Sequence, residues 1–223
     1  MKAAHGIGLV IIIVNFSFIF SSCSFSSPTE LTTSSPNKLY KVHMKEKEES
    51  GTDYIVKFSV EKQGRMLIED KIFHRDSGEF IGTGLKTNWL SENVLTFGWL
   101  NSSEQPDEIS VVNQTDKVIR YLKVTAGDRF LLLELQPYSK TQLLAYPQTD
   151  KTADISWIGG IGMYDDGQMI PAWGMNFRIR GKYISPARYC VLIKENEVVV
   201  QSKDFEGFLH NRDVQEAKNP SCQ

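Results

Sequence analysis

Phe130-Leu131-Leu132-Leu133-Glu134-Leu135 is a strongly apolar run. The turn residues Ala126-Gly127-Asp128 precede it and Pro137 follows it. A short run that stays apolar, instead of alternating apolar and polar residues, is typical of a strand with neighbours on both sides and cover on its faces. The sequence therefore predicts that this segment lies at the centre of a sheet.

Segments with alternating apolar and polar residues lie on both sides of the run, at spacings of about ten residues, and turn residues separate them. The predicted strands lie at 39–44, 54–60, 66–73, 94–99, 108–112, 118–124, 142–146, 155–164, 172–180, 189–194 and 198–202. The charged stretch at 45–50 is interpreted as a turn, and 91–97 and 205–214 are the only helix candidates. This pattern predicts an all-β protein, an antiparallel β-sandwich with little helix.

The predicted strands fall into two groups, an N-terminal β sub-domain at 38–100 and a C-terminal β-sandwich sub-domain at 107–209, followed by a tail at 210–223. The pattern leaves open whether the groups form one domain or two. In the second group a strand ending in Asn113-Gln114-Thr115 leads into another apolar strand. That order resembles the immunoglobulin-like domains of bacterial envelope proteins, and the resemblance is one of pattern without a motif.

The first 22 residues read as a secretory signal, with Lys2 before a short apolar stretch that ends at Phe20. Phe20-Ser21-Ser22-Cys23 resembles the lipobox of bacterial lipoproteins, although most lipoboxes have Leu in place of Phe20 and Gly or Ala in place of Ser22. The resemblance implies cleavage before Cys23 and acyl chains on this residue, which would hold the protein on a membrane. Secretion without a lipid and an uncleaved membrane anchor are the alternatives.

Residues 23–37 are rich in Ser, Thr and Pro and are predicted to form a flexible tether. Ser24 follows the predicted lipid site, where an Asp resembles the inner-membrane retention signal of Gram-negative lipoproteins. In a Gram-negative host the resemblance thus implies an outer-membrane lipoprotein that faces the periplasm.

Charge and cysteine content narrow the class of protein further. Cleavage after residue 22 removes one basic residue and no acidic one, which leaves 24 basic against 27 acidic residues and a net charge of −3. Such a chain has no basic field that would attract nucleic acid. Cys190 and Cys222 then remain besides Cys23, and in an oxidising envelope the pair predicts a disulfide. Two unpaired thiols are the alternative.

Motifs for catalysis, metal binding or cofactor binding are missing from the sequence: it has no HExxH and no GxSxG segment. The glycines of 159–162 lack the Lys-Ser/Thr of a phosphate loop, so a β-bulge or a close backbone approach is predicted there. Asp165-Asp166-Gly167 lacks the other ligands of a calcium loop and is predicted to be a hairpin turn. No metal site and no cofactor is predicted.

The candidates for a binding surface are Trp99, Trp157 and Trp173. Burial in the core is the favoured interpretation of these tryptophans, because such side chains supply much of the buried area of a small sandwich. The leading hypothesis is a lipid-anchored, non-catalytic cell-envelope protein whose β-rich domain binds an envelope partner. One alternative is an envelope hydrolase acting on glycan or peptide, whose pocket would involve Glu69, Asp70, His74, Asp165 or Asp166. The other is a carbohydrate-binding module, with tryptophans in a row on one sheet face.

Overall fold

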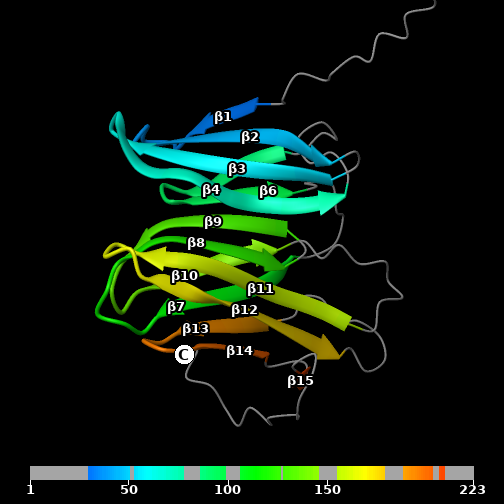
Figure 1. Ribbon diagram of the computed structural model, residues 1–223. Coiled ribbons are helices and arrows are strands. Elements are labelled where there is room, and N and C mark those ends of the chain that lie inside the picture. Colours follow the sequence, from blue (N-terminus) through cyan, green and yellow to red (C-terminus); the bar gives the residue numbers. More distant parts are fainter. Residues whose placement is uncertain are drawn as a thin grey trace, which may run out of the picture.

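The computed structural model describes residues 30–50, 53–77, 86–98, 106–126, 128–145, 155–178, 188–202 and 206–208. Within these residues the chain consists of strands and turns, with no helix, and the strands form three sheets stacked as layers (Figure 1). The predicted all-β sandwich is thus confirmed. All described strand pairs are antiparallel except β7 and β13, which run parallel.

The layers are named here from one end of the stack to the other. Sheet A has the order β1 (Glu30–Ser34), β2 (Tyr40–Ser50), β3 (Asp53–Lys62), β4 (Arg65–Ser77). Sheet B, in the middle, has the order β15 (Glu206–Phe208), β12 (Met169–Arg178), β11 (Ile155–Tyr164), β8 (Ile119–Ala126), β9 (Asp128–Leu135), β6 (Val94–Gly98), β5 (Lys86–Ser91). Sheet C has the order β10 (Lys140–Ala145), β7 (Asp107–Asn113), β13 (Arg188–Ile193), β14 (Val198–Ser202).

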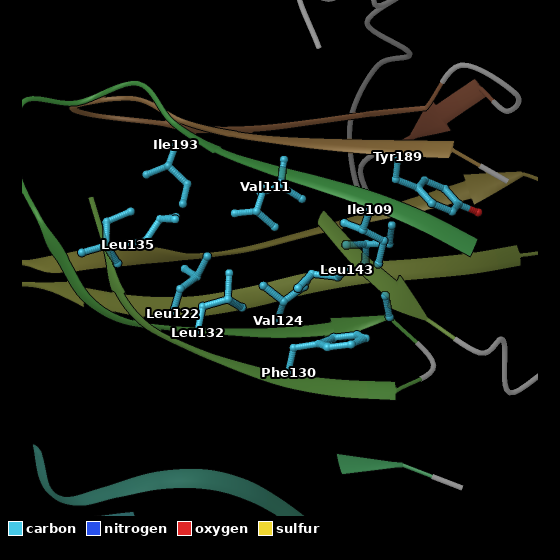
Figure 2. Close-up of a cluster of buried hydrophobic side chains, with 14 of the residues drawn as sticks. Ile109, Val111, Leu122, Val124, Phe130, Leu132, Leu135, Leu143, Tyr189 and Ile193 are labelled. Atoms are coloured by element: carbon cyan, nitrogen blue, oxygen red, sulfur yellow. The ribbon is translucent and has the colours of Figure 1, made fainter. Parts of the chain in front are cut away.

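Strand β9 lies inside sheet B, between β8 and β6, and is covered on both faces. Phe130 and Leu132 point into the layer between sheets B and C, where they meet Ile109, Leu143 and other buried side chains (Figure 2). Leu131 and Leu133 belong to the separate apolar cluster between sheets A and B. Two apolar layers, one on each face, explain why this segment shows no alternation.

Aromatic rings hold sheet A on sheet B. The Phe73 ring lies 4.7 Å from that of Phe97 and 6.0 Å from that of Phe58, and Phe58 lies 5.5 Å from Tyr121, measured between ring centroids. The four side chains come from four different strands, two in each sheet, and all four are buried. Edge-to-face and tilted contacts of this kind stabilise a core beyond the area they bury.

A polar contact joins the same two sheets at one end. The Tyr40 hydroxyl donates a hydrogen bond to the Glu134 carboxylate of β9, and Lys62 Nζ lies 2.7 Å from Glu134 Oε2. Burial of the Tyr40 ring, with the carboxylate beside it, raises the pKa of this hydroxyl well above its usual range. The contact therefore keeps Tyr40 protonated and adds a polar link between sheets A and B.

Three sequence-based boundaries change in the structure. Residues 30–34, predicted as part of the tether at 23–37, form β1 and pair with β2. The charged stretch at 45–50, interpreted as a turn, continues β2 through Ser50. The helix candidate at 91–97 is wrong, because Ser91 ends β5, a turn follows and β6 begins at Val94. Within the candidate at 205–214, the structure describes only 206–208, which form β15.

The predicted boundary between 38–100 and 107–209 is crossed by backbone pairing. Strand β6, from the first group, pairs with β9 of the second, and Leu95 and Phe97 of β6 share an apolar cluster with Leu131 and Leu133. The two groups therefore share sheet B. Local alternation identifies a strand but does not determine which distant strand it pairs with.

Candidate functional site

The glycines of β11 let side chains and backbone approach closely. The register of β11 against β12 shifts between Gly160 and Gly162, which confirms the predicted bulge and close approach. A Cβ at position 160 would lie 2.2 Å from the Lys123 backbone oxygen and 2.6 Å from the Trp173 ring. Only glycine fits this position without a movement of β8 or of Trp173.

Trp157 lies flat across two other glycines. Gly159 of β11 and Gly174 of β12 are register partners, and a Cβ on Gly159 would lie 2.3 Å from Trp157 Cζ2, while one on Gly174 would lie 3.0 Å from Trp157 Nε1. The indole nevertheless keeps 46% of its surface exposed. We call Trp157, Gly159 and Gly174 the tryptophan platform.

The platform lies beside the part of sheet B that sheet A covers. Its strand neighbour Ile161 pairs in register with Lys123 of β8, and Lys123 Nζ donates a 2.5 Å hydrogen bond to the backbone oxygen of Phe73 in β4. Burial lowers the pKa of Lys123, and the charge of Arg129 adds to this shift. Lys123 thus links sheet B to sheet A through β4. The tryptophan platform lies beyond the area of sheet B that sheet A covers.

The other predicted tryptophans do not join Trp157. Trp173 points to the opposite face of sheet B, where it packs partly buried against the core between sheets B and C. Its Nε1 is buried and has no hydrogen-bond partner within the described part of the chain. Trp99 lies outside the described residues. The described tryptophans therefore do not form the row on one sheet face that the carbohydrate-binding hypothesis requires.

A second feature lies on the outer side of sheet A. Strand β2 places basic residues at alternate positions on this side, and β3 adds one more. We call this group the basic face: Lys41, His43, Lys45, Lys47 and Lys57. A hollow of about 510 Å³ lies among four of them, and Thr32, Ser59, Glu30 and Asp70 also line it. Because the charged residues at 45–50 favour a turn, the sequence does not predict this face. The Lys-x-His-x-Lys-x-Lys alternation of 41–47 was the available signal.

His43 is held within this hollow by neighbouring strands. Its Nδ1 lies 3.1 Å from Thr32 Oγ1 of β1, and its Nε2 lies 3.3 Å from Glu61 Oε1 of β3. Ser59, its register partner, accepts a 3.1 Å hydrogen bond from the backbone N–H of Asp70, which has φ of 43° at a bulge in β4. These contacts orient His43 and Ser59 but do not join them as base and nucleophile.

The carboxylates named for a hydrolase do not converge. Asp165 and Asp166 are exposed in the hairpin between β11 and β12, where Gly167 has φ of 89°, as predicted for a turn. Lys117 Nζ lies 2.7 Å from Asp166 Oδ2, and this hydrogen bond is the main reason that the pKa of Asp166 is lowered. Glu69 and Asp70 are exposed on β4, and the side chain of His74 lies outside the described residues. No group of three metal-ligating side chains was found in the described ranges.

The predicted cysteine sites are described only in part. Cys190 is buried in β13, with 4% of its surface exposed. Cys23 and Cys222 lie outside the described residues. The described residues contain no helix that is long and apolar enough to cross a membrane.

Comparison of the chain with models of protein families, with curated proteins and with solved structures gave no match. The function is therefore argued from the chain's own residues.

Proposed function

We propose that the protein is a lipid-anchored, non-catalytic cell-envelope protein that binds a protein partner through the tryptophan platform. The observation that carries the proposal is the half-exposed Trp157 ring lying on a floor of two glycines. An anchored domain has no need of such a ring for its fold, since the apolar clusters between the sheets bury their side chains without it.

Interfaces concentrate their binding energy in a few residues, and tryptophan is foremost among them. A ring supported from below loses little conformational freedom when a partner covers its upper face. The glycine floor also keeps the surface flat, because neither Gly159 nor Gly174 has a side chain that would rise beside the ring. The platform therefore fits a complementary apolar surface on another protein.

Replacing Trp157 with alanine is expected to weaken partner binding by about 2–3 kcal/mol, which is about 30- to 150-fold, as at interface hot spots. The fold should remain, because almost half of the ring is exposed. The measurement is crosslinking in intact cells, followed by purification of the protein and quantification of the crosslinked envelope protein. Circular dichroism of the purified variant checks the fold.

Tyr138→Ala is the matched control, since Tyr138 is 74% exposed and lies in the turn between β9 and β10. This variant should retain the crosslinked partner. Equal recovery of the partner with Trp157→Ala would contradict the proposed site, and no crosslinked envelope protein with the unmodified chain would contradict a partner-binding function.

We further propose the lipid anchor at Cys23, in the outer membrane and facing the periplasm if the host is Gram-negative. The lipobox-like segment 20–23 supports this proposal. In a Gram-negative host the protein is expected in the membrane fraction, with an intact mass that includes the acyl chains on Cys23. Cys23→Ser should release it or stop its maturation. A processed Cys23→Ser protein that stays membrane-bound would contradict the anchor.

A disulfide between Cys190 and Cys222 is the third proposal, supported by the number of cysteines and by the oxidising compartment. It would tie the end of the chain to β13. Its removal by Cys222→Ser is expected to lower the free energy of unfolding by about 3–4 kcal/mol in oxidising buffer and to have little effect in strong reductant. Denaturant titrations in the two buffers measure this difference, and equal results in both would contradict the disulfide.

A further inference from the structure

The outer side of sheet A carries slightly more lysines than carboxylates, because Glu30, Glu61 and Asp70 lie among Lys41, Lys45, Lys47 and Lys57. Lys45 and Lys57 are direct register partners on β2 and β3, and like charges in such positions destabilise a sheet. Lys45 Nζ lies 2.8 Å from Glu30 Oε1, whereas Lys47 and Lys57 have no ion pair among the residues that the structure describes. This side of sheet A thus has a small excess of positive charge, in a chain whose net charge after the proposed cleavage is −3.

One exposed apolar side chain borders these cations. Ile72 of β4 is the register partner of Lys57 and is 50% exposed, whereas Met66, which is 53% exposed, is the register partner of Glu61. Lysines that surround exposed apolar side chains are typical of surfaces that bind anionic lipid headgroups. The apolar groups can enter the headgroup region while the ammonium groups meet the phosphates.

The length of chain before β1 limits where the basic face can lie. Only six residues, 24–29, lie between Cys23 and Glu30, the first residue of β1. Fully extended, they reach at most about 25 Å. Glu30 itself lines the hollow of the basic face, and sheet A is the outer layer that contains β1 (Figure 1). Sheet C lies two layers farther along the stack, at about 10 Å per layer.

We propose that the basic face docks on the anionic lipid headgroups of the leaflet that holds Cys23. The proposal rests on the lipid anchor, which keeps sheet A near the membrane, and on the charge complementarity between the lysines and the headgroups. Docking neutralises the repulsion between Lys45 and Lys57. It also turns sheet C away from the membrane and leaves the tryptophan platform, on sheet B, at the side of the molecule for its partner.

The test uses the lipidated protein in two kinds of vesicle, phosphatidylcholine alone and phosphatidylcholine with phosphatidylglycerol. Lysines are modified with an amine-reactive reagent, and mass spectrometry gives the rate at each one. In anionic vesicles Lys41, Lys47 and Lys57 should react about five-fold more slowly, as expected from the attraction of each lysine to an anionic surface. Lys140 and Lys194, which lie on sheet C or directly after its strand β13, should react equally in both. High salt should remove the difference.

A variant separates lipid docking from a general change in accessibility. With Lys45, Lys47 and Lys57 all replaced by glutamine, Lys41 should lose its protection in anionic vesicles. The matched variant Lys140→Gln/Lys194→Gln should keep it. Circular dichroism checks that both variants are folded.

Two negative outcomes are distinct. If the protein does not float with either vesicle, the anchor is wrong and the docking proposal is overturned with it. If the protein floats with both and the lysines of the basic face react at the same rate in both, docking on anionic lipid alone is overturned.

Discussion

Replacing Leu133 with alanine is expected to lower the free energy of unfolding by about 2–5 kcal/mol, the usual cost of truncating a buried leucine. Leu133 is fully buried in the cluster between sheets A and B. The loss includes the transfer of its side chain and the cavity left between Phe58, Tyr121 and their neighbours, which belong to both sheets. Chemical denaturation of the purified protein measures this change.

The neighbouring substitution Leu132→Ala makes the comparison informative. Leu132 is 1% exposed and belongs to the cluster between sheets B and C, so an equal cost of about 2–5 kcal/mol is expected from the other face of the same strand. Leu144→Ala, at a 45% exposed position of β10, serves as the control and should change stability by less than about 0.5 kcal/mol. A Leu133→Ala protein as stable as this control would contradict the packing of sheet A on sheet B.

Replacing Asn113 with alanine is expected to cost about 3–5 kcal/mol, although the residue is polar. The Asn113 amide is fully buried and donates to the backbone oxygens of Lys117, at 2.8 Å, and Gln136, at 3.0 Å. Its Oδ1 accepts from the Thr115 hydroxyl at 2.7 Å and from the Thr115 N–H at 3.1 Å. Alanine would leave these buried groups unpaired, and each unpaired group costs about 1–3 kcal/mol.

Asn113 also connects two layers, since it ends β7 of sheet C, while Gln136 follows β9 of sheet B. Thermal and denaturant unfolding of Asn113→Ala measure the cost. Gln114→Ala is the control, because Gln114 is exposed and its backbone N–H, which donates to Ile193, is kept. A loss below about 1 kcal/mol with Asn113→Ala would show that water replaces the lost partners.

The Asn113-Gln114-Thr115 segment shows which contacts the local sequence predicts and which it does not. It was recognised as the end of a strand before an apolar strand, and this is where β7 ends and where the turn before β8 begins. The hydrogen bonds from Thr115 to Asn113 are local, so residue types and spacing predict them. The bond to Gln136 joins residues that are 23 apart in sequence, and no short-range pattern indicates it.

The candidate site shows the same division. The sequence offers Trp157 as a binding candidate but favours its burial in the core, whereas in the structure the ring is half exposed and lies over the paired glycines at 159 and 174. Trp173, which was grouped with it, points to the other face, because a strand turns successive side chains to opposite sides and a bulge changes the phase. The sequence does not predict the basic face, because the charged residues at 45–50 favour a turn. In the structure β2 continues through these residues, and the alternation of 41–47 places the basic side chains on one side of the sheet.

By itself, the sequence determined the class of fold, the strand at 130–135 and the hairpin at Asp165–Gly167, since apolar runs and turn residues act between neighbours in the chain. Only the tertiary structure decided that 86–98 completes sheet B, that sheet A covers part of it, and that Trp157 remains uncovered. The backbone hydrogen bonds between two strands are nearly the same whichever strands pair, so they do not select the partner. The choice of partner therefore depends on which apolar faces fit together, and that fit is settled only when all layers are in place.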